Sequence, residues 1–367
     1  MRKIFTGFAV LAVVFSSTTD AFAGNKDRIG QAGATELLIN PWGRSTGLFG
    51  MNTSFVKGLD AMKTNIAGLS FVEQTEVGVS HSMYLSGSGI GINNLGFAQK
   101  VGKLGVIGAN IMAMSFGEID ITDYNNPEGG VGTYTPQFFN VQVGFAKEFS
   151  NSIHAGVGAT FVSEQISNVK ASGSVFEAGI QYRTGKRNNF HFGLTLRNIG
   201  TGMRFSGSGF SINSEAQYDA TYSLNRQTPT ETFEMPTYLN IGVSYDFYLD
   251  ENKGVKPEDE QSAEGFTPQH RATVLGNFTS NSFNNDYLGA GVEYAFKEMF
   301  MVRAAYRYES KIGNKDLSTT FYTGLSAGAT VQYKVNETGP TLALDYSFRP
   351  TRRPANGVHV ITLRLMR

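Results

Sequence analysis

The sequence predicts an all-β fold, a transmembrane antiparallel β-barrel of about 14 strands that follows an N-terminal hatch segment. Long segments alternate between apolar and polar residues, which is the pattern of a strand with two different faces. Charged residues make up only 17% of the 367 residues, below the roughly 25% typical of soluble domains. No stretch approaches 18 unbroken apolar residues, so only a closed barrel would let this chain cross a bilayer.

The stretch "TYLNIGVSYDFYL", residues 237–249, shows the alternation most clearly. Leu239, Ile241, Val243, Tyr245 and Phe247 share one face, and the opposite face is polar or glycine. Thirteen residues are long for a strand of a globular protein, where about 5–6 are typical. Because tyrosines recur on the apolar face near strand ends, we expect this face to meet lipid. The alternative is a soluble secreted β-sandwich.

Similar segments recur along the chain, and their even number fits the rule for single-chain bacterial barrels. The fourteen predicted strands are 75–86, 88–100, 103–116, 136–148, 152–163, 168–183, 188–199, 237–249, 269–279, 286–296, 299–310, 319–333, 340–348 and 357–366. With the N-terminus in the periplasm and the first strand running outward, the short connections become periplasmic turns. The long connections 117–135 and 200–236 then lie outside, and the acidic connection 250–268 is an exception on the periplasmic side.

The chain divides into three predicted parts. Residues 1–23 form a signal peptide, with a basic start, an apolar centre and an Ala-Phe-Ala cleavage site. Residues 24–74 do not alternate and contain the only tryptophan, so we expect a hatch packed in the lumen, with a short helix near 53–63. Residues 75–367 form the barrel. On the wet face we expect Ser244→Arg to be milder than Val243→Arg on the lipid face.

Composition indicates a chain without catalytic chemistry. The net charge is zero and there is no cysteine, so nothing suggests a nucleic-acid partner or a thiolate metal site. None of the five histidines lies in an H-E-x-x-H arrangement, and the glycine-serine runs lack P-loop and nucleophile-elbow spacing. We therefore expect no metal, no cofactor and no enzymatic activity.

Residues 35–71, "TELLINPWGRSTGLFGMNTSFVKGLDAMKTNIAGLSF", carry a family resemblance. The segment resembles the N-terminal region of the PorV/PorQ family, outer-membrane barrels of the type IX secretion system that look like relatives of FadL channels. The matching residues are Arg44, Gly47, Gly50, Asn65, Ala67, Gly68 and Leu69. Ile66 departs from the family, where proline is usual. The resemblance implies a FadL-like fourteen-stranded barrel in the cell outer membrane.

The resemblance also implies a non-enzymatic role in protein secretion. The expected partners are translocon or attachment-complex proteins and secreted cargo with C-terminal sorting domains, besides outer-membrane lipid and lipopolysaccharide. The alternative is a FadL-like channel for hydrophobic small molecules. That alternative requires an apolar pocket in the lumen, and the residues assigned to the lumen are mostly charged or glycine.

The candidate partner-binding residues lie on the long connection 200–236. Phe205, Phe210, Phe233 and Met235 are bulky apolar residues among Ser, Thr and Asn, a composition that suits docking of a protein. The alternative, to which the sequence gives equal weight, is that these residues fold back over the barrel mouth and pack there. A second candidate is the turn "RPTRRP", where Arg349, Arg352 and Arg353 are placed to contact lipopolysaccharide phosphates or only solvent.

Overall fold

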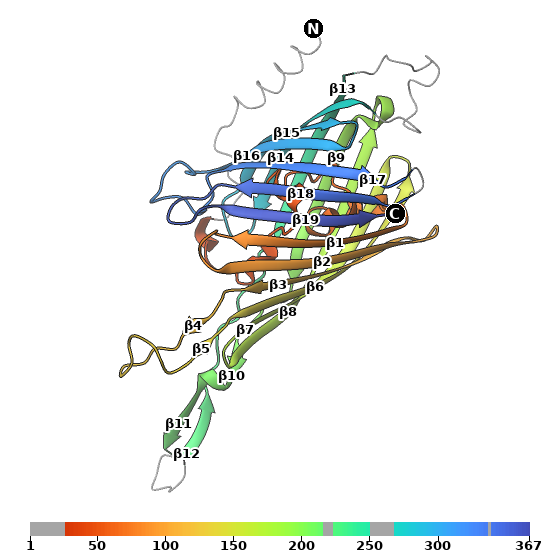
Figure 1. Cartoon of the computed structure of the whole chain (residues 1–367). Helices are drawn as coiled ribbons and strands as arrows, with labels where there is room; N and C mark the ends of the chain where they lie inside the picture. Colours follow the sequence, from red (N-terminus) through yellow and green to blue (C-terminus); the bar gives the residue numbers. More distant parts are fainter. Residues whose placement is uncertain (1–25, 216–222, 250–267, 337–338) are drawn as a thin grey trace.

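The computed structural model describes residues 26–215, 223–249, 268–336 and 339–367. The predicted signal peptide and nearly all of the acidic connection 250–268 lie outside these residues. Fourteen long strands of the described chain pair antiparallel in one sheet, and β1 pairs with β19 to close it (Figure 1). The wall consists of β1 (Thr75–Tyr84), β2 (Ile90–Val101), β3 (Gly105–Ser115), β6 (Gln137–Ser150), β7 (Ile153–Ile166), β8 (Val169–Thr184), β9 (Phe190–Gly200), β13 (Tyr238–Tyr248), β14 (His270–Asn281), β15 (Tyr287–Phe296), β16 (Phe300–Glu309), β17 (Leu325–Lys334), β18 (Thr341–Arg349) and β19 (Val358–Met366).

The predicted barrel of about 14 antiparallel strands is confirmed, and most predicted boundaries agree with the structure within three residues. The segment 319–333 differs, because β17 begins only at Leu325. Residues 319–324 have β-forming composition but belong to a connection that turns inward. Tyr322 is buried there, and its ring centroid lies 5.1 Å from that of Phe49.

The burial pattern of β13 is inverted relative to a soluble protein. Val243 is 40% exposed, whereas its neighbour Ser244 is 2% exposed. The exposed set includes the six tyrosines of the predicted lipid face, namely Tyr182, Tyr245, Tyr294, Tyr306, Tyr308 and Tyr346. A wall with apolar and aromatic residues outside and polar residues inside is the arrangement of an outer-membrane barrel.

Arginine at Val243 should destabilise the barrel by about 2–4 kcal/mol, the usual cost on the lipid face near the bilayer midplane. The milder effect expected for Ser244→Arg does not fit the structure, because the lumen holds packed chain there instead of water. The Ser54 hydroxyl donates a hydrogen bond to the Ser244 oxygen at 2.9 Å. We now expect Ser244→Arg to be at least as damaging. Denaturant unfolding in lipid vesicles measures both, and a stable Ser244→Arg variant would contradict the packed lumen.

Most connections at one end of the barrel are short, with the connection 249–269 as the exception. The connections 102–104, 151–152 and 297–299 are short turns at one end, which we assign to the periplasm and call the inner end. The long connections leave the other, outer end. They include β4 (Ile119–Asp120) with β5 (Thr133–Tyr134), and β11 (Ser211–Glu215) with β12 (Ser223–Gln227), two hairpins that extend away from the wall (Figure 1).

Between these two hairpins along the chain lie shorter elements near the wall. β10 (Ser206–Gly207) pairs with the outer end of β8, and η6 (Ser208–Phe210) follows it. At the inner end, η5 (Lys186–Asn188) connects β8 to β9. The bulge between β8 and β9 lies near Asn198, whose φ is +59°.

Residues 26–74 are here called the plug; residues 27–31 are mostly exposed, whereas residues 41–69 are mostly buried inside the wall (Figure 1). Their helical elements are η1 (Lys26–Arg28), η2 (Thr35–Leu38), α2 (Gly43–Thr46), η3 (Gly58–Lys63) and η4 (Ile66–Phe71). The helix expected near 53–63 is only the single 3-10 segment η3.

The plug begins at the outer end, contrary to the expected periplasmic start of the chain. Arg28 forms an ion pair of 2.5 Å with Glu234 and lies over the ring of Phe283. The Gly33 amide donates to the Glu234 carbonyl at 3.0 Å. From there the plug runs through the lumen to β1 at the inner end, so it occupies the full height of the barrel.

Candidate functional site

Glycines on the inner face of the wall give the plug room to pack. A Cβ on Gly78 would come within 2.9 Å of the Trp42 indole, and one on Gly96 within 2.8 Å. These two glycines are paired across β1 and β2, so the outer edge of the indole's six-membered ring packs against bare backbone. Ile66 contacts a second such pair, Gly144 and Gly158, on β6 and β7. The alternation of glycine with apolar residues in these strands therefore serves plug packing.

The residues of the Asn-x-Ala-Gly-Leu motif are all buried in the plug. Asn65 caps η4 by accepting a hydrogen bond from the Ala67 amide at 3.2 Å. Its amide nitrogen donates to the carbonyls of Thr53 and Ile180, each at 3.0 Å. Asn65 thus joins two parts of the plug to strand β8. Gly68 allows a close crossing, because a Cβ there would lie 2.1 Å from the Val56 carbonyl oxygen.

The other three motif residues lie around α2. Gly47 fits between the Arg303 side chain and the backbone of Gly328, each within about 3.2 Å of a Cβ placed there. Gly50 has a φ of +74°, a conformation that favours glycine. Arg44 points toward the wall, where its guanidinium donates to Glu293 at 3.2 Å. The motif residues therefore bring the plug into contact with opposite sides of the wall.

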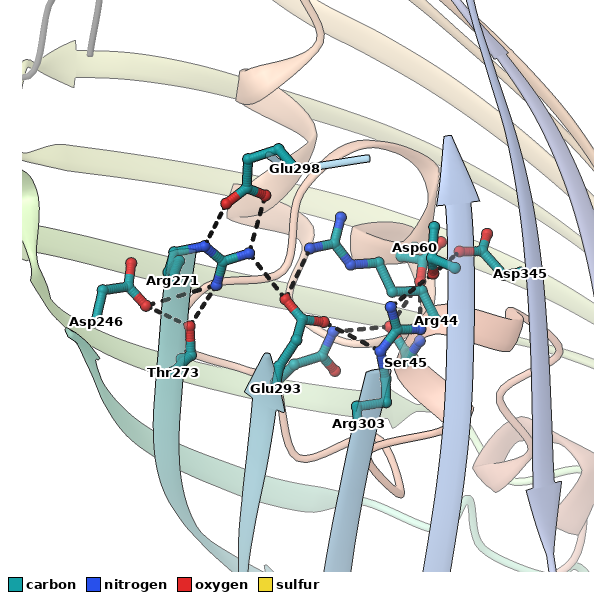
Figure 2. Close-up of polar contacts among 12 residues, drawn as sticks. Arg44, Ser45, Asp60, Asp246, Arg271, Thr273, Glu293, Glu298, Arg303 and Asp345 are labelled. Atoms are coloured by element: carbon teal, nitrogen blue, oxygen red, sulfur yellow. Dashed lines mark hydrogen bonds and ion pairs between the residues drawn. The ribbon is translucent and has the colours of Figure 1, made fainter. Parts of the chain in front are cut away.

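Glu293 on β15 is the centre of a buried ion network, shown in Figure 2. Its carboxylate is fully buried and accepts from Arg44 of the plug, from Arg271 of β14 at 3.1 Å and from Arg303 of β16 at 3.1 Å. Arg271 also binds Glu298 at 2.6 Å and lies 3.7 Å from Asp246. Three wall strands and the plug thus share one carboxylate.

The network continues across the next strands. Arg303 donates to the Thr330 hydroxyl at 2.6 Å, and that hydroxyl donates to Asp345. Asp345 binds Arg364 at 3.0 Å. Arg364 in turn lies 3.9 Å from Asp60 of the plug, which also accepts from Ser45. We call this set of residues, from Asp246 to Asp60, the charged belt; it fastens the plug to the wall at two points.

A cavity of about 360 Å³ with a mixed apolar and polar lining lies above the plug at the outer end, and we call it the outer pocket. The plug contributes Leu38, Ile39, Phe49 and Met51 to it. The wall and the outer connections contribute the aromatic residues Tyr84, Phe116, Phe138, Tyr238, Tyr287, Phe321 and Tyr322. Sequence reasoning missed this pocket, because its apolar residues come from the plug and from strand ends and not from the centres of the strands.

The polar margin of the outer pocket contains Glu36 and Lys63 of the plug. Burial, and then the Glu164 carboxylate, raises the pKa of Glu36 to about 8. Burial, and then Arg197, lowers the pKa of the Lys63 ammonium to about 8. Both groups are nearly inaccessible to solvent, so each is less charged near neutral pH than its model compound.

A second cavity of about 950 Å³ opens at the inner end. Its lining is basic, with Arg44, Lys57, Arg183, Arg271 and Arg364 among the residues around it. The plug lies between the two cavities. Packed chain of the plug therefore separates a molecule in the outer pocket from the inner cavity.

The four candidate partner-binding residues divide by burial. Met235 is 2% exposed and packs with Met203 against Gly173. Phe205 and Phe233 are half-buried on the same cluster, with ring centroids 5.7 Å apart. Phe210 is half-buried in η6. Met235 is therefore a packing residue and unavailable as a surface anchor, since this part of the connection folds back over the barrel mouth.

The arginine turn is likewise only partly on the surface. Arg349 is 7% exposed and its guanidinium carbon lies 4.7 Å from the centroid of the Tyr322 ring. Its proposed contact with lipopolysaccharide phosphates is wrong, because the side chain points into the outer pocket. Arg353 is exposed and Arg352 is partly exposed.

Comparison with solved structures shows which known folds this chain resembles. No family model and no curated protein matches the sequence. The toluene transporter TbuX of Ralstonia pickettii aligns with a TM-score of 0.52 and 13% identity over 89% of this chain and 98% of that chain. The toluene transporter TodX of Pseudomonas putida aligns with a TM-score of 0.53 and 12% identity over 89% and 97%. This chain has the closed, FadL-like fourteen-strand barrel of bacterial outer-membrane proteins.

Two kinds of feature are absent from the described residues. No helix there is long and apolar enough to cross a membrane. No group of three or more His, Asp or Glu side chains there is placed to hold a metal ion.

Proposed function

We propose that this chain binds a small hydrophobic molecule in the outer pocket and admits it across the outer membrane. The observation that carries the proposal is the outer pocket itself, since small-molecule sites are concave, mostly apolar and about 300–1,000 Å³ in volume. The names of the structurally similar TbuX and TodX, both toluene transporters, point to the same class of ligand.

Admission requires displacement of the plug. The plug contacts the wall through glycine-backed packing and through the charged belt, and it separates the outer pocket from the inner cavity. Binding in the pocket touches the plug directly at Phe49 and Met51. A ligand that binds better when the plug is displaced shifts the plug toward that state.

Filling the outer pocket with a larger side chain should weaken the binding of naphthalene. Thr320 lines the pocket on the connection before β17, and a tryptophan there would occupy the apolar space. We expect Thr320→Trp to lower the affinity for naphthalene at least 10-fold, measured by equilibrium dialysis of the purified barrel against a protein-free detergent control. The matched variant is Leu317→Trp, because Leu317 is exposed on the same connection and does not line the pocket. Equal naphthalene affinity in both variants would contradict a role for this pocket.

The second candidate function is a non-enzymatic part in type IX protein secretion. It is supported by the resemblance of residues 35–71 and by the two hairpins at the outer end, which present apolar side chains to solvent. Tyr124 near β4 is 99% exposed and Ile212 of β11 is 59% exposed. Apolar groups of this kind on a projecting hairpin suit docking of a secreted protein or an attachment-complex protein.

This second function predicts that the hairpins carry the partner contacts. We expect the double variant Tyr124→Ser, Ile212→Ser to lose copurification of translocon components and cargo with C-terminal sorting domains, identified by mass spectrometry in mild detergent. Barrel folding should be unchanged, as judged by heat-modifiable gel mobility. If the same secretion proteins copurify with the double variant at wild-type yield, the hairpins are not the docking site.

A further inference from the structure

Two arginines in the wall of the outer pocket form no direct ion pair with any described residue, although Glu309 is close enough to Arg307 to act on it electrostatically. Arg307 on β16 and Arg349 on β18 both line the pocket. Within the described ranges of the chain, neither guanidinium lies within ion-pair distance of a carboxylate. The acid nearest in the sequence, Glu309, is instead bound by Asn285 and Thr319.

The guanidinium groups are also short of hydrogen-bond partners. Nε and Nη2 of Arg349 and Nε of Arg307 are buried and have no acceptor among the residues that the structure describes. Leaving a buried charged donor unpaired costs more than leaving a neutral one unpaired. A pocket with such donors in its wall is therefore suited to a ligand that brings its own acceptor.

Aromatic rings hold both arginines in place. The Arg307 guanidinium carbon lies 4.1 Å from the Phe49 centroid and 4.2 Å from the Tyr287 centroid. The Arg349 carbon lies 4.7 Å from the Tyr322 centroid and 5.4 Å from the Phe49 centroid. Cation–π contacts of this kind stabilise the charges and fix the planar donor groups, yet use none of their in-plane hydrogen bonds.

We propose that the ligand of the outer pocket is a small aromatic carboxylate. This inference rests on the proposed binding function and names its substrate class. Arginine presents donors in a planar fork that matches a carboxylate. The rings around the two arginines, with Phe49 and Tyr322 edge to face at 81°, offer the faces and edges that an aromatic body prefers.

An aromatic carboxylate differs from a hydrocarbon ligand in its charge. Neutral aromatic hydrocarbons would leave both guanidinium groups unpaired, whereas a carboxylate satisfies them. Glu36 lies elsewhere on the pocket lining, with Lys63 near it. The negative end of the ligand therefore belongs at the Arg307–Arg349 wall.

The test compares 2-naphthoate, naphthalene and octanoate on the purified barrel by equilibrium dialysis. We expect 2-naphthoate to bind at least 10-fold more tightly than naphthalene or octanoate. Arg307→Gln and Arg349→Gln should each lower naphthoate affinity at least 10-fold, and each should lower it by a much larger factor than it lowers naphthalene affinity. Arg353→Gln, on the same turn as Arg349 but exposed, should change neither. Heat-modifiable mobility of each variant verifies that the barrel is folded. Arg349→Lys is a second variant, which keeps the positive charge but lacks the planar pair of donors.

The outcomes distinguish the two proposals. If naphthalene binds as tightly as naphthoate, or if both glutamine variants keep naphthoate affinity, the carboxylate proposal is overturned and the hydrophobic-ligand function stands. If octanoate binds as tightly as naphthoate, the aromatic part is overturned. If none of the three probes binds the wild-type barrel, both the proposed function and this inference are contradicted.

Discussion

Replacing Glu293 with glutamine should destabilise the folded barrel by about 3–5 kcal/mol, the usual cost of removing one partner from a buried ion pair. The Glu293 carboxylate is fully buried and faces the guanidinium groups of Arg44, Arg271 and Arg303. Glutamine keeps the size of the side chain but leaves these three cations without their shared anion. Equilibrium unfolding in denaturant, with the barrel in lipid vesicles, measures the loss.

Glu298→Gln is the matched control. Glu298 also binds Arg271, but its side chain is 28% exposed and touches neither Arg44 nor Arg303. Water screens this pair in part, so we expect a loss of about 1 kcal/mol or less. A Glu293 variant that unfolds at the same denaturant concentration as the Glu298 variant would show that the charged belt does not hold the plug.

The wall was predictable from the sequence because the two faces of each strand meet different surroundings. Lipid on one side and packed plug on the other impose a strict period of two, and Val243 beside Ser244 displays it. The prediction failed where that rule does not apply. Residues 319–324 have strand-like composition, but Tyr322 turns inward to Phe49 and Arg349, and only the tertiary contact decides that.

The contents of the lumen were less predictable. The lumen-facing charges were identified, yet their pairing depends on the stagger of neighbouring strands and on the plug, which no local pattern reveals. The outer pocket combines Phe49 of the plug with Tyr84, Tyr287 and Tyr322 of distant segments. The sequence predicts Arg349 at the surface, because it lies next to a polar turn. Its cation–π contacts to Tyr322 and Phe49 appear only once the barrel is closed.

Fastening the plug to the wall should stop uptake without stopping binding. Ser54 of the plug and Ser244 of β13 are both buried, and their hydroxyl oxygens are 2.9 Å apart. A disulfide needs Cβ atoms about 3.5–4.5 Å apart, and the hydroxyl contact places these two side chains next to each other. The chain has no cysteine of its own, so Ser54→Cys, Ser244→Cys can form only this bond within one molecule.

In the oxidised double variant we expect naphthalene uptake by vesicles or cells to fall to the level of cells without the barrel, while binding in the outer pocket stays within twofold of wild type. Treatment with a reductant should restore uptake, because the disulfide is the only change between the two states. Ser54→Cys alone should transport normally under both conditions.

Undiminished uptake by the oxidised variant would mean that the ligand passes without separating Ser54 from Ser244, and the route would then lie along another face of the plug or sideways through the wall. Loss of binding together with uptake would instead place the effect of the disulfide on the outer pocket, since Ser54 and the pocket residues Phe49 and Met51 belong to the same stretch of plug.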